Sequence, residues 1–309
     1  MSILVTGGTG MVGSNFSNDK DVTIVGSEVD LRDQEQCLQL FSDLQPESVV
    51  HLAAKVGGVK ANHENLGSFF YDNILINTNV LESARVTKVK KVVSLLSTCV
   101  YPAATTYPLV EDQIHSGPPH YTNFAYAHAK RMLDVQSRAY RQQYGCNFIT
   151  AIPNNLFGEN DNFHLEDSHV IPAIIRKMYE AKITGKDVKL WGDGSPLREF
   201  TYSKDIKDIL QFLLETYNGA APINIGNTSE VSIKYVAETI SEILDFDGKI
   251  IWDTTEIKGQ YRKPSDNSKL LSLGWKTESY TNIKEALINV CKWFIINYPN
   301  IRGFNDDKK

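Results

Sequence analysis

The feature that most limits how this chain can fold is a glycine-rich turn directly behind its first apolar segment. Residues 2–6 read Ser-Ile-Leu-Val-Thr, which is typical of a buried strand, and a GxxGxxG pattern follows before a short expected helix. Glycine permits a tight turn, a close approach of the backbone to a pyrophosphate, and contact between helix and strand. The turn consists of Gly7, Gly8, Thr9, Gly10, Met11, Val12 and Gly13. Glycine turns are common, but this position in a strand-turn-helix unit favours a dinucleotide site.

Behind this turn, strand-like segments alternate with helix-like segments. The strand-like segments are 22–25, 48–54, 91–96 and 146–152, and the helix-like segments are 34–44, 66–86, about 125–143, 170–182, 232–245 and 282–296. This alternation predicts an α/β fold with a doubly wound parallel sheet of the Rossmann type. We expect a dinucleotide-binding domain over residues 1–158, completed by a strand near 222–227. Residues 159–309 should form mostly a smaller, C-terminal substrate-binding region.

The composition excludes several other classes of protein. With 309 residues, 42% of them hydrophobic and 22% charged, the chain can build a globular core and is not disordered. A net charge of −5 offers no broad attraction to nucleic acid or to an anionic membrane, and no apolar stretch reaches the ~18 residues of a membrane span. The four cysteines form no CxxC pair, so neither a zinc site nor a disulfide framework is indicated. We therefore expect a cytoplasmic protein with no metal site and no nucleic-acid or membrane partner.

The end of the second strand leaves the choice of nicotinamide cofactor open. An acidic residue at this place binds the ribose 2′-hydroxyl of NAD, whereas a basic residue binds the 2′-phosphate of NADP. Gly26 and Ser27 are compatible with a phosphate, but Glu28 would repel one if it pointed inward. Asp30 could reach the adenine amino group, or it could cap the helix that starts near Asp33. Both cofactors and both roles of Asp30 remain possible.

The third strand ends in Leu52, Ala53 and Ala54. Small side chains at the carboxyl end of a parallel strand let a cofactor approach closely. Alanine is equally suited to tight core packing, so both interpretations stay open.

A serine, a tyrosine and a lysine are placed to act on one carbonyl group. Ser97 follows the fourth strand, and an extended backbone there would put Ser97 and Cys99 on one face. Tyr126 and Lys130 are four residues apart on the next helix, so they share a face. The lysine ammonium and a positive nicotinamide ring would favour the tyrosinate, whose reference pKa is about 10. Each residue alone is more often structural, but together behind a dinucleotide turn they predict carbonyl chemistry.

Several longer stretches carry a resemblance to a known family. They are 7–13, 51–58, 96–102, 126–130, 161–163 with 168–172, and 191–192 with 198–200. On these the chain resembles the extended short-chain dehydrogenase/reductases and, within them, the GDP-L-fucose synthase family. The resemblance implies conversion of GDP-4-keto-6-deoxy-D-mannose to GDP-L-fucose, by epimerisation at C3 and C5 and then NADPH-dependent reduction at C4. It also implies a homodimer formed through the helices near 66–86 and 125–143.

The resemblance also implies roles for individual residues. Cys99 would be the base of the epimerisation, His169 the acid, and Tyr126 the proton donor of the reduction. Taken alone, a strand-end cysteine is more often a small buried hydrophobe, and a histidine at a helix start is often a capping group. Implied cofactor contacts are Gly7, Gly8, Thr9, Gly10, Met11, Val12, Gly13, Asp30, Leu52, Ala53, Ala54, Lys130, Pro153, Asn155, Leu156 and His169. Implied contacts with the GDP-sugar are Lys177, Trp191, Arg198 and Asp266.

Some positions depart from the family pattern, and rival functions exist. Lys177 stands where some members have arginine, Asn154 replaces a more usual threonine, and Glu28 leaves NADH possible beside NADPH. A 3,5-epimerase that retains NAD usually pairs its cysteine with a lysine, whereas this chain offers His169. A 4,6-dehydratase would need an acidic residue near Cys99, and a non-enzymatic nicotinamide sensor would have a broken Ser/Tyr/Lys set. Neither condition holds here.

Overall fold

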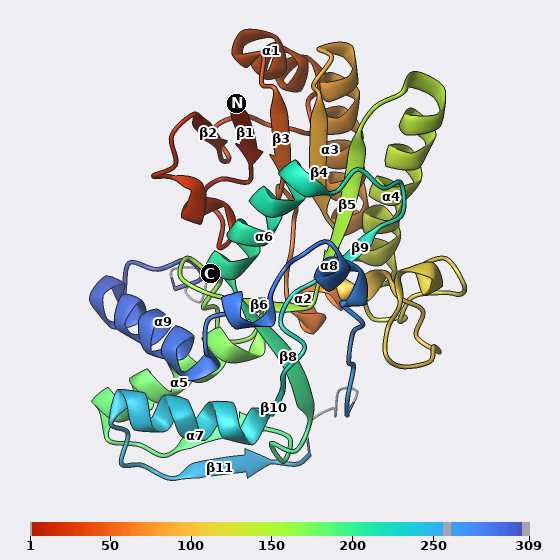
Figure 1. Cartoon of the computed structure of the whole chain (residues 1–309). Helices are drawn as coiled ribbons and strands as arrows, with labels where there is room; N and C mark the ends of the chain where they lie inside the picture. The colour runs from red at the N-terminus through yellow and green to blue at the C-terminus, as the bar shows by residue number, and fades with distance from the viewer. Residues whose placement is uncertain (1, 256–260, 305–309) are drawn as a thin grey trace.

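The computed structural model describes residues 2–255 and 261–304, and its centre is a parallel sheet (Figure 1). The strand order is β2-β1-β3-β4-β5-β9, and every neighbouring pair is parallel. The strands are β1 (Ile3–Thr6), β2 (Val22–Val25), β3 (Ser48–His51), β4 (Lys91–Leu95), β5 (Phe148–Pro153) and β9 (Ile223–Ile225). The order reverses between β1 and β3, and ligands bind at such a switch point, beyond the carboxyl ends of the strands. The predicted doubly wound sheet is confirmed, including the returning strand β9.

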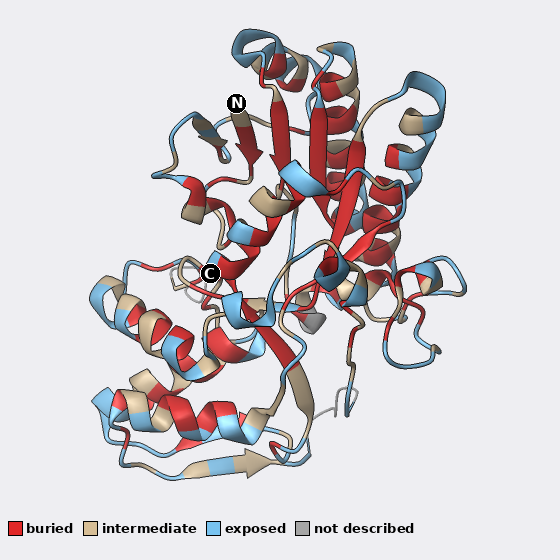
Figure 2. Ribbon diagram, in the orientation of Figure 1, coloured by how far each residue is buried: buried red, intermediate tan, exposed pale blue. Residues whose placement is uncertain are grey.

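Helices cover both faces of this sheet, and the strands are its most buried part (Figure 2). One face packs against α1 (Gln34–Leu44), α3 (Leu66–Val86) and α4 (Phe124–Tyr144), and the other against α6 (Ser203–Thr216). Alternate strand residues serve the two faces: Val49 faces the first core and Val50 the second. The fully buried Ile206, Ile209 and Leu213 lie at helical spacing along α6. Sequence analysis missed α6, although it closes the second face.

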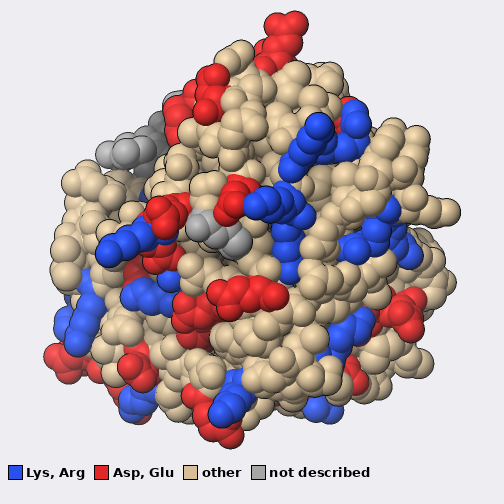
Figure 3. Space-filling view, turned by 45° about the horizontal axis from the view of Figure 1, so that its top comes forward, with Lys and Arg blue, Asp and Glu red and all other residues tan. Residues whose placement is uncertain are grey.

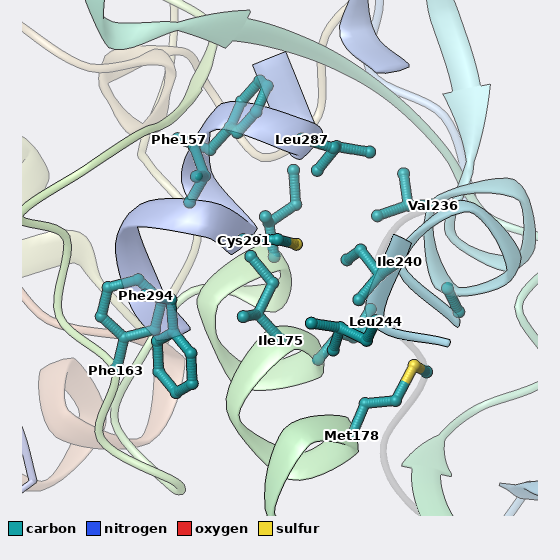
Figure 4. Packing of buried hydrophobic residues seen from close by; sticks show 14 of the residues in the cluster. Phe157, Phe163, Ile175, Met178, Val236, Ile240, Leu244, Leu287, Cys291 and Phe294 are labelled. Carbon is teal, nitrogen blue, oxygen red and sulfur yellow. The ribbon is translucent and has the colours of Figure 1, made fainter. Parts of the chain in front are cut away.

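The remaining elements form a second core. They are β6 (Asn155–Phe157), α5 (Val170–Thr184), β7 (Val188–Trp191), β8 (Leu197–Tyr202), β10 (Glu230–Ser232), α7 (Ile233–Leu244), β11 (Ile250–Asp253) and α9 (Ile283–Asn297). Two small sheets, β10-β8-β6 and β11-β7, accompany the three helices. Figure 4 shows Phe163, Ile175, Ile240 and Phe294 meeting among other apolar side chains of this core. Since α6 lies beyond residue 158 and packs on the first sheet, the two-domain division stays a prediction.

Three local expectations were wrong, each for a physical reason. The helix expected behind the glycine turn is a single 3-10 turn, η1 (Gly13–Phe16), because β2 already starts at Val22 and leaves room for little more. The strand expected over 48–54 ends at His51. The backbone is extended at Ser97 but not beyond it: Thr98–Val100 form a 3-10 turn, η2, capped by the Ser97 hydroxyl, which accepts the N–H of Cys99 at 3.4 Å.

The shorter elements connect these layers. They are α2 (Val59–Glu64), η3 (Glu111–Gln113), α8 (Ser268–Ser272) and η4 (Thr277–Ser279).

Over the described ranges, no helix is both long and apolar enough to cross a membrane. The same residues contain no group of three or more His, Cys, Asp or Glu side chains that could hold a metal ion. On the face shown in Figure 3, basic and acidic side chains are interspersed with uncharged surface.

Candidate active site

A cavity of about 1090 Å³ opens at the carboxyl ends of the central strands. Most ligand pockets hold about 300–1,000 Å³, so this one has room for a large ligand or for two ligands side by side. The predicted site residues that line it are Gly7, Thr9, Gly10, Met11, Val12, Gly13, Asp30, Leu52, Ala53, Ala54, Ser97, Cys99, Tyr126, Lys130, Pro153, Asn155, Leu156, His169 and Arg198. The structure therefore joins the dinucleotide turn and the candidate catalytic residues in one space. Among the described residues, the predicted Gly8, Lys177, Trp191 and Asp266 do not line it.

The glycine turn forms a backbone cradle at one end of the cavity. Gly7 has φ +73°, and a Cβ there would lie 2.7 Å from the backbone nitrogen of Ala53. A Cβ on Gly13 would collide with the backbone of Gly7 and Gly8. Gly8 has a packing role instead, since its Cβ would meet Ile24 of β2. Only backbone can occupy these places, so the turn fits a pyrophosphate that approaches its N–H groups.

Charged side chains line the part of the cavity that lies beyond the end of β2. Asp30 accepts two hydrogen bonds from the Arg32 guanidinium, at 2.9 and 2.8 Å, and these bonds lower the pKa of Asp30 to about 2. Arg32 also reaches Asp72 at 3.2 Å, and Lys55 contacts the other oxygen of Asp72 at 2.8 Å. The capping role considered for Asp30 is wrong, because Asp33 caps α1 through the N–H groups of its first turn. Sequence analysis missed Arg32 and Lys55; the position of Arg32 just beyond β2 was the available signal.

Glu28 turns back toward its own strand. Its carboxylate accepts the N–H of Gly26 at 2.7 Å, and this bond is the largest cause that lowers the pKa of Glu28. Glu28 is exposed and, within the described ranges, is not a lining residue of the cavity. A Cβ on Gly26 would lie 2.9 Å from this carboxylate and 2.6 Å from Thr9, so Glu28 stays beside residues that line the cavity.

Ser97 and Cys99 lie together on the cavity wall behind β4. The Ser97 hydroxyl is hydrogen-bonded to Cys99 and favours its thiolate, but burial has the larger effect and raises the pKa of Cys99. The charges of Lys263, Lys130 and Arg131 act in the opposite direction. Lys263 donates to the carbonyl oxygen of Thr98 at 2.9 Å, which places its ammonium beside the cysteine turn. Sequence analysis assigned no role to Lys263, since nothing in the local pattern brings residue 263 to residue 99.

Tyr126 and Lys130 extend from α4 into the same space. The Lys130 ammonium lies 6.0 Å from the centre of the Tyr126 ring and donates to the carbonyl oxygen of Leu95 at 2.9 Å. Burial lowers the pKa of Lys130 to about 8. Burial, with the charge of Cys99, raises the pKa of Tyr126 well above its usual value. In the protein without cofactor Tyr126 is thus protonated and ready to donate a proton, and the tyrosinate expected beside a bound nicotinamide ring stays a prediction.

The remaining predicted site residues come from the C-terminal half of the chain. His169 precedes α5 as its N-cap residue and faces the cavity without capping the helix through its side chain. Arg198 lines the cavity from β8. Lys177 lies along α5 with its ammonium 4.8 Å from the ring centre of Trp191, away from the cavity wall. Asp266 accepts the N–H of Ser268 at 2.7 Å at the start of α8, so its carboxylate has a structural partner there.

Known proteins are similar to this chain in sequence and fold over nearly its whole length. Residues 3–226 match the NAD dependent epimerase/dehydratase family. A GDP-L-fucose synthase of Dictyostelium discoideum is 43% identical over 312 residues, covering 97% of each chain. A structure of a GDP-L-fucose synthetase from Naegleria fowleri bound to NADP is 39% identical with a TM-score of 0.91, covering 97% of this chain and 96% of that one. A GDP-mannoheptose C4 reductase from Campylobacter jejuni with NADP bound is 28% identical with a TM-score of 0.84, covering 95% and 98%. The chain therefore belongs to the NAD dependent epimerase/dehydratase family and, within it, to the family of its GDP-L-fucose synthase relatives.

Proposed function

We propose that this protein converts GDP-4-keto-6-deoxy-D-mannose to GDP-L-fucose, by 3,5-epimerisation followed by NADPH-dependent reduction of the C4 ketone. One observation carries the proposal: a single cavity holds the glycine turn, the Ser97/Tyr126/Lys130 set, and the pair Cys99 and His169. The first two features serve reduction, whereas the Cys/His pair is needed only for proton exchange at carbon. The nucleotide-sugar relatives described above support the same substrate class.

The cofactor is NADPH, which supplies a hydride for C4 when it is bound. The backbone cradle of the glycine turn would hold its pyrophosphate, and the strand ends at Leu52 to Ala54 and Pro153 to Leu156 would surround it. The carboxylate of Glu28 accepts the N–H of Gly26. Arg32 and Lys55, which both contact Asp72 on the cavity wall, would face the adenosine part of the cofactor.

The epimerisation follows from the acidity of carbons beside a ketone. Cys99, as thiolate, removes a proton from C3 and then C5, and His169 returns one to the opposite face of each carbon. Ser97 and Tyr126 donate hydrogen bonds to the C4 oxygen and stabilise the charge that develops there. During reduction Tyr126 gives its proton to that oxygen, and Lys130 lies beside it. Each acid or base group contributes about 10²–10⁴ in rate.

The diphosphate of the sugar would lie near Arg198 and Lys263, the cations on the wall beyond Cys99. Lys177 and Trp191 would contact the outer part of the nucleotide sugar, beyond the cavity edge. Asp266 would act through the segment that carries Lys263. Residues 159–309 would thus supply most of the nucleotide-sugar site, and residues 1–158 most of the cofactor site.

We also propose a cytoplasmic homodimer that pairs α3 and α4 with their copies. Apolar side chains are exposed on both helices: Phe70 and Tyr71 on α3, and Phe124, Met132 and Val135 on α4. Pairing the helices of two copies would bury them, as expected for the core of a dimer interface. The mixed surface charge in Figure 3 supports a protein without a nucleic-acid partner.

The proposal is tested by adding GDP-4-keto-6-deoxy-D-mannose and NADPH to the purified protein. We expect loss of NADPH absorbance and an NMR spectrum of GDP-L-fucose. A C4-reduced sugar that keeps the starting configuration at C3 and C5 would leave a simple reductase and refute the epimerase half. Absence of NADPH oxidation with this substrate would refute the proposal as a whole.

A further inference from the structure

A buried carboxylate lies behind the wall of the cavity and has no role in the site as described so far. Glu199 of β8 is 2% exposed. Within the described ranges, its neighbours Arg198 and Phe200 line the cavity but Glu199 does not. Its Oε1 accepts the N–H of Ser265 at 3.0 Å, and its Oε2 accepts the Ser265 hydroxyl at 2.5 Å. Since a buried carboxylate needs donors in place of its water, Ser265 is fixed to β8 at two points.

Asn154 holds the same carboxylate from the end of β5. This residue stands where the family resemblance leads us to expect threonine. Its side-chain nitrogen donates to Oε2 of Glu199 at 3.4 Å and to the carbonyl oxygen of Asn227 at 2.7 Å. The hydroxyl of Thr201, also in β8, donates to the side-chain oxygen of Asn154 at 2.6 Å. Glu199 therefore connects the end of β5 with the segment 263–266.

Leu109 holds this segment from its other side. The N–H of Leu109 donates to the carbonyl oxygen of Pro264 at 2.8 Å, and the N–H of Asp266 donates to the carbonyl oxygen of Leu109 at 2.9 Å. Leu109 is fully buried. The segment 263–266 is thus fixed between a buried backbone and a buried carboxylate, and its first residue, Lys263, lines the cavity.

Lys263 joins the segment to the turn that carries Cys99. Its ammonium donates to the carbonyl oxygen of Thr98 at 2.9 Å. Arg131 of α4 donates from Nε to the carbonyl oxygen of Val100 at 2.7 Å. The residues before and after Cys99 are therefore each held by a cation.

The two cations differ in what carries them. Arg131 belongs to the 21-residue helix α4, which fixes its position. Lys263 belongs to neither a helix nor a strand, so its position depends on the contacts of the segment 263–266. Lys130 also acts on the Cys99 thiol, but α4 carries it as well.

We propose that Glu199 is a positioning residue for Lys263: through Ser265 it holds the segment 263–266 so that the ammonium stays on the carbonyl oxygen of Thr98, beside Cys99. The inference rests on the role proposed for Cys99 in the epimerisation. In this arrangement Lys263 orders the cysteine turn and favours the thiolate that accepts a proton from the sugar. Glu199 itself takes no part in the proton transfer.

The test measures the rate of Cys99 alkylation by iodoacetamide against pH, by peptide mapping, in the protein without substrate. In Glu199→Gln the profile should move to higher pH, by a few tenths of a unit to about one unit, because Lys263 is no longer held on the turn. Loss of the negative charge alone would move the profile to lower pH, since a neighbouring carboxylate disfavours a thiolate. The direction of the shift therefore separates positioning from a direct effect of charge. In a Lys263→Met background, Glu199→Gln should cause no upward shift.

Asp205 of α6 offers a matched control. It is 5% exposed, and its carboxylate accepts the N–H and the hydroxyl of Thr281 at 3.0 and 2.6 Å, the same arrangement as Glu199 with Ser265. Over the described part of the chain, neither Asp205 nor Thr281 lines the cavity. Asp205→Asn should therefore lower the urea midpoint, as Glu199→Gln does, but leave the alkylation profile of Cys99 at the wild-type position.

An unchanged profile or a shift to lower pH in Glu199→Gln would overturn the proposal. So would an upward shift that persists in the Lys263→Met background, or an equal upward shift in Asp205→Asn, which would indicate a general disturbance of the fold. If circular dichroism shows that Glu199→Gln does not fold, Ser265→Ala, which removes only the hydroxyl, is tested against the same outcomes. Since alkylation needs no substrate, its result is independent of whether the proposed reaction is correct.

Discussion

Gly7 and Gly145 offer a matched test of the backbone cradle, because their φ angles are nearly equal and their surroundings differ. Gly7 has φ +73° and Gly145 has φ +72°, so alanine is strained equally at both. That strain costs about 1–2 kcal/mol. A Cβ on Gly145 would meet nothing within 4 Å, whereas a Cβ on Gly7 would lie 2.7 Å from Ala53 N and 2.9 Å from Leu52 C. Both neighbours are backbone atoms, so relieving the overlap must move the turn away from the end of β3, at a further cost of about 1–3 kcal/mol.

Gly145→Ala should therefore lower the free energy of unfolding by about 1–2 kcal/mol, and Gly7→Ala by about 2–5 kcal/mol. Urea unfolding followed by tryptophan fluorescence measures both variants under the same conditions. NADPH affinity should fall in Gly7→Ala and stay at the wild-type value in Gly145→Ala, because only the first alanine distorts the turn. Equal destabilisation of the two variants, or unchanged NADPH affinity in Gly7→Ala, would show that the cradle does not work as described.

Three further predictions concern charge and assembly. Lys263→Met should move the pH dependence of Cys99 alkylation to higher pH, since the ammonium of Lys263 lowers the pKa of the thiol. Peptide mapping after iodoacetamide treatment measures the alkylation of Cys99, and Lys55→Met is the control. The pKa of Lys130 is about 8 in the folded protein and about 10.4 in the unfolded chain. Between these two pH values the unfolded chain binds more protons than the folded protein, so the free energy of unfolding rises with pH. Lys130→Met should lack that gain in urea unfolding, and a slope identical to wild type would contradict the assignment. Met132→Glu with Val135→Glu on α4 should convert a dimer into monomers in sedimentation analysis, whereas an unchanged mass would place the interface elsewhere.

The periodic parts of the chain could be predicted from sequence because their patterns are local. Helix α1 ends before Pro46, as its apolar spacing and that proline predicted. Helix α3 also begins and ends where its apolar spacing and the following polar segment predicted. Tyr126 and Lys130 share a helix face, as their spacing of four required. Ser97 and Cys99 do line one cavity, although the reason was wrong: the serine side chain caps a 3-10 turn, so Thr98 faces the cavity as well.

The remainder depends on contacts between distant parts of the chain. Lys263 lies beside the turn that carries Cys99 because a segment far along the chain returns to the first sheet. No periodicity or motif encodes such a meeting. Burial also raises the pKa of Tyr126, and only the three-dimensional structure reveals that burial. Glu28 shows the same limit: its residue type was known, but its bond to Gly26 was not.

If one cavity both epimerises and reduces a GDP-ketosugar, the number of solvent deuterium atoms in the product distinguishes this reaction from reduction alone. The reaction is run in deuterated water with NADPH, and the product is examined by NMR. We expect GDP-L-fucose with deuterium at C3 and at C5, formed as NADPH is consumed, and loss of that deuterium in Cys99→Ser. A reduced product without deuterium at either carbon would contradict the account and remove the roles given to Cys99 and His169.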